Sequence, residues 1–290
     1  MTGITYMRQS SESKKNNSVI DEKYIRKQCD DLLRQAEIKT PPVNLKILAS
    51  FAGIVSVEEA SIQEAGMLCP TERGLVVLLR DTDNERRKNF TCGHEISHTF
   101  FPGYKEKPQK RVDDEVGRYD TYDETESLCD YGASYLLMPD FLFIPQFKQH
   151  GFSTNSLKLL SETFESSLEA TAIRMVSQNP KRYAVVVWEE RYKPVEKKLE
   201  VQQSLPGFED ARPQKKLRVN FGYGFDKSEH IPKHKSLDEN GTLIARSYET
   251  GKAQNGEGLI TFSRELAMTC KIHTFPLKKQ GRLITLLEKI

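Results

Sequence analysis

The chain has 290 residues, which is enough for one large domain or two smaller ones. Its 43 basic and 41 acidic residues leave a net charge of +2. A protein that binds DNA or RNA through its overall charge needs a larger positive excess, so we expect no direct nucleic-acid binding. No apolar run approaches the 18 residues that a membrane-spanning helix needs, so we expect no membrane partner either.

The N-terminus and the cysteines indicate a cytoplasmic protein. Residues 1–20 are polar and lack the apolar core of a secretory signal, which predicts a disordered lead-in segment. The five cysteines form no CxxC pair, and an odd, unpatterned set predicts reduced thiols in the cytoplasm. They are Cys29, Cys69, Cys92, Cys129 and Cys270.

The first third of the chain mixes helical and strand patterns. Apolar residues at helical spacing predict a helix over residues 21–38, which the prolines of "KTPPV" end. The segment "NLKILASFAG" predicts a second helix that closes at Gly53. Short β-branched runs in "IVSVEE" and "GLVVLLRD" predict two strands. The second strand could hold an extended substrate as an exposed edge, although its apolar composition favours a core strand.

Helices are expected through the middle of the chain. Residues 85–101 form one, with a capping residue among positions 82–84, and an acidic loop follows over residues 103–123. The segment "DETESLCDYGASYLLMP" predicts the next helix, and residues 140–150 and 155–178 predict two more. Two successive helices could form a DNA-binding helix-turn-helix, but residues 152–178 are acidic on balance, which favours a core-bracing role.

The pattern changes after residue 181. The segments "RYAVVVWEE", "KLRVNFGYGF", "GTLIARSYE" and "EGLITFSREL" predict strands, and residues 191–214 predict a charged linker. We therefore expect an α+β chain: helices around a small sheet in a domain over residues 21–180, then a smaller β-rich domain over residues 181–290.

The stretch "FTCGHEISHTFF" carries the strongest chemical signal. On a helix, positions i and i+4 share a face, so His94 and His98 can direct two imidazole nitrogens at one ion. Glu95 follows the first histidine, which is the HExxH arrangement of zinc peptidases. The alternative is an ordinary helix that contains two unrelated histidines.

A third ligand is expected on a later helix. The metzincin continuation is excluded because Phe101 and Tyr104 occupy the positions that need glycine and histidine. In "ESLCD", Glu126 and Asp130 lie one helical turn apart, so Glu126 could bind the metal while Asp130 accepts the second N–H of a ligand histidine. Other acidic residues between positions 113 and 124, Glu124 among them, stay open as alternatives.

Two histidines and one glutamate leave a coordination position for water, which is typical of catalytic rather than structural zinc. Glu95 would then take the proton of that water and pass it to the leaving amine, so the expected reaction is amide hydrolysis. Zn²⁺ is the expected cofactor, and Mn²⁺ or Fe²⁺ would also suit this ligand set. Candidates for the oxyanion donor are Tyr119, Tyr122, Tyr131, His150 and Arg174.

These motifs resemble the ImmA/IrrE family of bacterial zinc metallopeptidases over about residues 21–180. The similar segments are "PPVNLKILASFAGI", "NERRKNFTCGHEISHTFF", "ESLCDYGASYLLMP" and "FESSLEATAIRM". The resemblance implies a gluzincin-like fold, with His94, His98 and Glu126 as ligands and Glu95 as general base. The chain departs from the family in having Gly132 where Phe is common and Cys129 where Ala is usual.

The resemblance also implies a regulatory role. Family members cleave a helix-turn-helix repressor and so release genes for mobile-element transfer or stress responses, which makes a transcriptional repressor the expected protein substrate. Residues 181–290 could sense a signal or dock the substrate. The alternative is a metal-bound regulatory or antitoxin-like module that binds without cutting, but such a module has no use for a base at Glu95.

Overall fold

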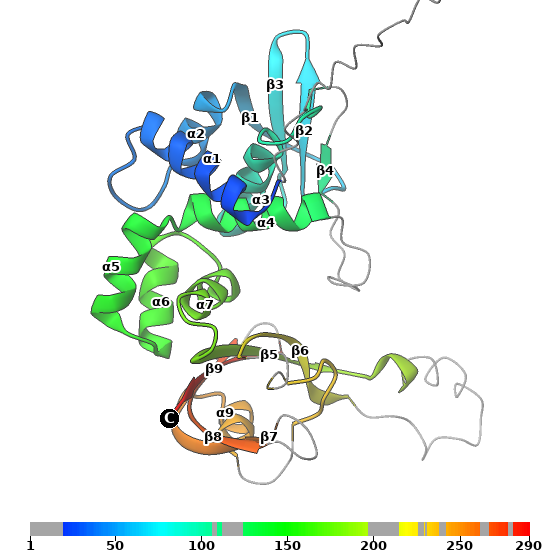
Figure 1. The fold of residues 1–290 in the computed structure, drawn as a ribbon. Helices are drawn as coiled ribbons and strands as arrows, with labels where there is room; N and C mark the ends of the chain where they lie inside the picture. Colours follow the sequence, from blue (N-terminus) through cyan, green and yellow to red (C-terminus); the bar gives the residue numbers. More distant parts are fainter. Residues whose placement is uncertain are drawn as a thin grey trace, which may run out of the picture.

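The computed structural model describes residues 20–105, 109–111, 124–196, 215–225, 229, 231–237, 242–261, 267–277 and 281–290. The expected lead-in over residues 1–20 therefore lies almost wholly outside the described residues, as does most of the expected linker over 191–214. Figure 1 shows an upper part built from α1 to α4 and one sheet, three helices below it, and a second sheet at the bottom.

Two capped helices open the described chain. Helix α1 spans Glu22–Gln35, and the Asp21 side chain caps it by accepting a 2.8 Å hydrogen bond from the Tyr24 N–H. Helix α2 spans Leu45–Phe51 and is capped by Asn44. Gly53 follows it with φ +80°, a left-handed conformation that favours glycine. Both expected helices are confirmed, with α1 ending three residues before the predicted end.

The upper sheet contains both predicted strands and one that the sequence did not indicate. Strand β1 spans Ile54–Ala60 and β3 spans Gly74–Arg80. Strand β2, Gly66–Thr71, was not expected because its sequence "GMLCPT" contains glycine and proline. The order is β1-β3-β2-β4, where β4 is Gln109–Arg111 in the expected loop. Strand β3 pairs on both sides, so it is the core strand that its composition favours and not an exposed edge.

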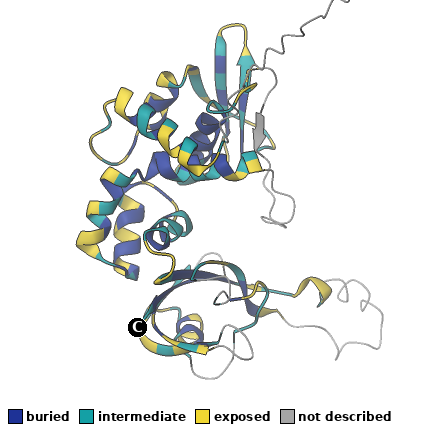
Figure 2. Ribbon diagram, in the orientation of Figure 1, coloured by how far each residue is buried: buried dark blue, intermediate teal, exposed yellow. Residues whose placement is uncertain are grey.

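One long helix, α3, lies against this sheet, and a second, α4, packs on α3. Helix α3 spans Glu85–His98 and begins at Asn84, whose side chain accepts a hydrogen bond from the Arg87 N–H at 3.1 Å. Helix α4 spans Glu124–Leu137 and packs along α3. Every residue of α3 from Thr91 to His98 is buried, and Figure 2 shows this inner part of the molecule in dark blue.

Three further helices connect the two sheets. Helix α5 spans Asp140–His150, α6 spans Thr154–Thr163 and α7 spans Leu168–Ser177. The helix predicted over residues 155–178 is thus two helices. It breaks where Glu165 takes φ +49° and where the Ser167 side chain caps α7.

The burial of α7 argues against a helix-turn-helix. A helix that reads DNA must present a free face to the groove, whereas none of the 10 residues of α7 is exposed. Arg174 pairs with Asp140 of α5, and Glu169 pairs with Arg282 of the lower sheet at 3.2 Å. Helix α7 therefore braces the helices against the sheet, as the acidic balance of this segment predicts.

The lower sheet is antiparallel, with the order β6-β5-β9-β8-β7. Its strands are β5 (Tyr183–Arg191), β6 (Lys216–Gly224), β7 (Gln254–Thr261), β8 (Ala267–Leu277) and β9 (Arg282–Lys289). The prediction of a β-rich region is confirmed in this part of the chain.

The segment "GTLIARSYE" was predicted as a strand, and this prediction is wrong. It forms helix α9, Leu243–Thr250, which packs on β7 and β8. The Thr242 side chain caps the helix by accepting from the Ala245 N–H at 3.1 Å, and Gly251 ends it with φ +63°. Buried residues at helical spacing, Ile244, Ala245 and Ser247, outweigh the preference of Ile244 and Thr242 for strands.

The lower sheet is covered on both faces, which follows from the alternation of side chains along a strand. Val185 and Val187 of β5 join the hydrophobic core of the upper part and the connecting helices. Ala184, Val186 and Trp188 belong to a second core that includes Ile244 of α9. The larger core thus continues across residue 180, the boundary that the sequence predicts between two domains.

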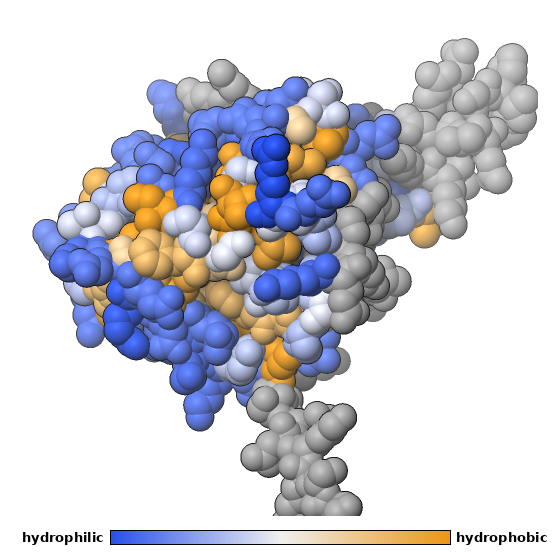
Figure 3. All heavy atoms as spheres, turned by 90° about the horizontal axis from the view of Figure 1, so that it is seen from above, coloured by the Kyte–Doolittle hydropathy of each residue, from blue (hydrophilic) through white to orange (hydrophobic). Residues whose placement is uncertain are grey.

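Apolar side chains are also exposed on the upper part. Ile47 and Phe51 of α2 and Val55 of β1 are 46%, 49% and 57% exposed. Figure 3 views the molecule from above and shows apolar residues gathered in the middle of this face, with hydrophilic residues around them. Among the described residues, no helix has both the length and the apolar character needed to cross a membrane.

Candidate metal centre

Small residues let α3 and α4 approach closely beside the predicted site. A Cβ atom added at Gly93 of α3 would lie 3.1 Å from the Cα atom of Ala133 of α4. A Cβ atom added at Gly132 of α4 would collide with the side chain of Ser97. The close approach brings the facing side chains of the two helices into contact. Because a larger residue at position 132 would collide with α3, this packing requires glycine there.

The structure brings His94, His98 and Glu126 together. His94 Nε2 lies 3.2 Å from His98 Nε2 and 3.1 Å from Glu126 Oε2, and His98 Nε2 lies 3.5 Å from Glu126 Oε1. Two ligand atoms held about 2.0–2.1 Å from a tetrahedral ion lie about 3.3 Å apart. The three distances bracket that value, so these atoms are spaced as ligands of one ion would be.

The other ring nitrogens of the two histidines face α4 as well. Asp130 Oδ1 lies 2.9 Å from His94 Nδ1, which is the contact expected from the spacing of "ESLCD". The Cys129 sulfur lies 3.4 Å from His98 Nδ1, and Cys129 is fully buried. His94, His98 and Cys129 also form a buried group of possible metal-binding atoms that all lie within 4.8 Å of one another.

Sequence reasoning missed the contact of Cys129. It treated this residue only as a small substitution for alanine. The available signal was its position three residues after Glu126, since positions i and i+3 share a helix face.

Glu95 lies buried between α3 and strand β2. Its side chain is fully buried, and a Cβ atom added at Gly66 of β2 would lie 2.9 Å from Glu95 Oε1 and would collide with Thr91. Strand β2 therefore packs against the Glu95 side chain, and glycine at position 66 leaves room for the carboxylate. This strand is the one that the sequence did not predict.

We expect Gly66→Ala to lower the free energy of unfolding by about 1–2 kcal/mol, because overpacking outweighs the gain from removing a strand glycine. Thermal or urea unfolding measures this change. Thr91→Ser removes the methyl group that collides, so the double variant should recover part of the loss. A single Gly66→Ala variant as stable as the wild type would contradict the close packing of β2 on α3.

Two of the described candidates for an oxyanion donor have other partners, and the third, His150, is exposed at the end of α5. Arg174 donates to the Met138 carbonyl at 3.0 Å and pairs with Asp140. Tyr131 stacks on Tyr135 with ring centroids 6.3 Å apart, and burial raises the pKa of Tyr131. Tyr119 and Tyr122 lie outside the described residues.

Two hollows lie away from the histidines. One, of about 330 Å³, lies among α2, α3, β1 and β3 and is lined by Lys88, Glu59 and Cys92. Lys88 is only 8% exposed, and its hydrogen bond to Glu59 raises its pKa. Burial raises the pKa of Cys92 to about 12, so this thiol stays neutral.

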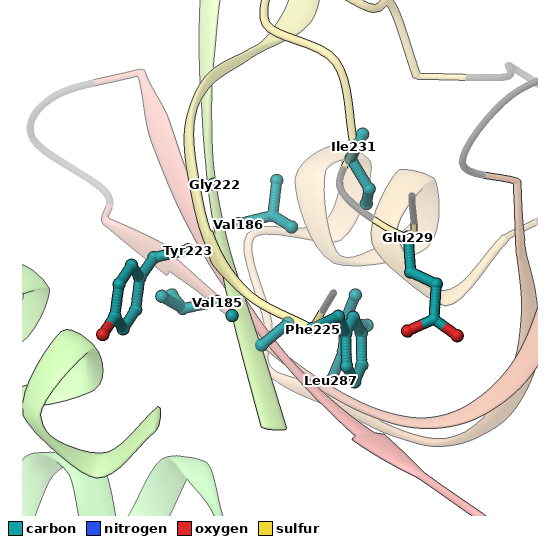
Figure 4. A pocket seen from close by; sticks show the side chains of 10 residues that line it. Val185, Val186, Gly222, Tyr223, Phe225, Glu229, Ile231 and Leu287 are labelled. Atoms are coloured by element: carbon teal, nitrogen blue, oxygen red, sulfur yellow. The ribbon is translucent and has the colours of Figure 1, made fainter. Parts of the chain in front are cut away.

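The other hollow, in the lower sheet, has Val186, Phe225 and Ile231 among its lining residues and measures only about 10 Å³ (Figure 4). That volume holds one water molecule at most. This hollow therefore offers no room for a small signalling ligand.

The comparisons with known proteins concern the same part of the chain as the paired histidines. The profile of the IrrE N-terminal-like domain, a family of M78 peptidases, matches residues 53–176. These residues contain α3 and α4, so this part of the chain is similar to that metallopeptidase family.

A solved structure of a Mycobacterium tuberculosis transcriptional regulator is similar to nearly the whole chain. The TM-score is 0.53 at 11% sequence identity, over 91% of this chain and 76% of that one. At this identity the likeness concerns the fold alone. No curated protein matches the chain.

Proposed function

We propose that the chain is a zinc-dependent endopeptidase in which His94, His98 and Glu126 hold the ion and Glu95 acts as general base. The observation that carries this proposal is the mutual spacing of the two Nε2 atoms and the Glu126 carboxylate, at 3.1–3.5 Å. Three protein ligands of this kind leave one position for water, as catalytic zinc sites do.

Each side chain then has one task. A bound zinc ion would lower the pKa of a water molecule and polarise the substrate carbonyl. Glu95 accepts the proton of that water and delivers it to the leaving amine, so no covalent intermediate forms. Asp130 accepts the Nδ1–H of His94, which keeps the Nε2 lone pair directed at the ion.

The substrate that we propose is one specific intracellular protein, with a helix-turn-helix transcriptional repressor as the candidate class. Its cleavage would switch on genes under stress, in line with the family resemblance. For residues 181–290 we propose a role in docking the substrate or in sensing a signal.

Metal content tests the proposal directly. We expect elemental analysis to find about one zinc per wild-type chain and none in His94→Ala. Loading with Mn²⁺ or Fe²⁺ in the same assay tests whether zinc is preferred. A wild-type protein that takes up no metal after incubation with zinc would contradict the peptidase proposal and favour a non-catalytic interaction module.

A further inference from the structure

The two histidines of the site differ in the group that contacts their Nδ1 atom. The Nδ1 atom of His94 faces the Asp130 carboxylate at 2.9 Å, whereas the Nδ1 atom of His98 faces the sulfur of Cys129 at 3.4 Å. Cys129 and Asp130 are adjacent in α4, so one turn of this helix contacts the Nδ1 atoms of both histidine rings. His98 is 2% exposed and Cys129 is fully buried, so water does not readily replace the sulfur.

The tautomer of His98 decides whether it can bind an ion. A neutral imidazole carries one proton, so an Nε2 atom that donates its lone pair to a metal requires the proton on Nδ1. A sulfur atom can accept that Nδ1–H. If the thiol instead donated to Nδ1, the ring proton would lie on Nε2 and would block metal binding.

The same geometry places the sulfur away from the proposed ion. His98 Nε2 faces His94 and Glu126, at 3.2 and 3.5 Å. The sulfur lies on the Nδ1 side of the ring, and the two ring nitrogens point in diverging directions. A single ion held at His98 Nε2 is therefore separated from Cys129 by the imidazole.

We infer that Cys129 is a positioning residue: its sulfur accepts the Nδ1–H of His98 and holds this histidine in the tautomer that binds the metal. This inference rests on the function proposed above, because it assigns a role toward the same metal site. The family resemblance leads one to expect alanine at position 129. The inferred role explains why a cysteine there is compatible with the site.

Zinc affinity, measured by competition with a chromophoric chelator, tests the inference without any substrate. We expect Cys129→Ala to bind zinc about tenfold more weakly, as is typical for loss of a group that orients a ligand histidine. Cys129→Ser keeps a shorter acceptor and should fall between Cys129→Ala and the wild type. Cys29→Ala is the matched control, because Cys29 is also fully buried but contacts the Gly132 carbonyl of α4 instead of a histidine.

Two spectroscopic readouts separate positioning from packing and from direct ligation. In zinc-loaded protein labelled with ¹⁵N-histidine, NMR should find His98 protonated at Nδ1, and this proton should exchange faster with water in Cys129→Ala. The cobalt-loaded wild type should lack a sulfur-to-cobalt charge-transfer band. Such a band, lost in Cys129→Ala, would make the cysteine a ligand and overturn the inference.

The outcomes also separate this inference from the proposed function. Wild-type protein that binds no zinc would refute both. Wild-type protein that binds zinc, together with a Cys129→Ala variant of equal affinity, would refute only the role of Cys129. Thermal melts of the metal-free variants establish that each one is folded before its affinity is compared.

Discussion

Glu95→Gln should keep its metal and lose its peptidase activity. Glutamine has nearly the same shape as glutamate, so it fits between α3 and β2 where Gly66 leaves room for the side chain. Its amide cannot accept a proton from water. Removal of a general base typically costs about 10²–10⁴-fold in rate, and we expect a loss in that range.

The activity can be measured before the substrate is known. Extract of the source cells is incubated with each variant, and new peptide N-termini are quantified by mass spectrometry. Wild-type protein should generate a small set of new N-termini that a zinc chelator suppresses. Glu85→Gln is the matched control, since it makes the same change at the exposed start of α3 and should cut at the wild-type rate. Undiminished cleavage by Glu95→Gln would remove Glu95 from the mechanism.

Glu126→Ala should weaken zinc binding by more than about 100-fold, which exceeds the usual loss for a residue that only orients a ligand. The carboxylate lies 3.1 Å from His94 Nε2 and 3.5 Å from His98 Nε2, so its removal takes away the oxygen atoms that face both histidines. The protein should stay folded, because the Glu126 side chain is 29% exposed and belongs to neither hydrophobic core.

Zinc competition against a chelator measures this change, with circular dichroism as the check on folding. Glu124→Ala is the control, because Glu124 is the exposed first residue of the same helix. A large loss in Glu124→Ala and none in Glu126→Ala would move the third ligand to Glu124. No loss in either variant would direct the search to the acidic residues over positions 113–123.

Local patterns determined the helices of the site. The capping side chain at Asn84 and the spacing of His94 and His98 depend only on the period of one helix. The pair Glu126 and Asp130 follows from the same period on α4. For this reason the residues that meet in the proposed site could be selected from the sequence before any contact between α3 and α4 was known.

Predictions from local patterns were wrong in two segments whose secondary structure is decided by tertiary packing. Strand β2 contains glycine and proline and has little strand preference, yet it pairs with β3 and β4 and gives the room that Glu95 occupies. The segment of α9 contains β-branched residues, but its cap and the burial of Ile244 and Ala245 against the lower sheet favour a helix. In both segments the decisive partners are distant in the sequence.

By itself, then, the sequence determined which residues make up the candidate site: a histidine pair at one helical turn, a glutamate beside it, and a carboxylate pair on a later helix. Only the tertiary structure decided that Cys129 contacts His98, that Gly132 and Gly93 let α3 and α4 meet, and that β2 lies against Glu95. The physical reason is that a helical period relates residues four positions apart, whereas these contacts join segments whose approach depends on the packing of the whole core.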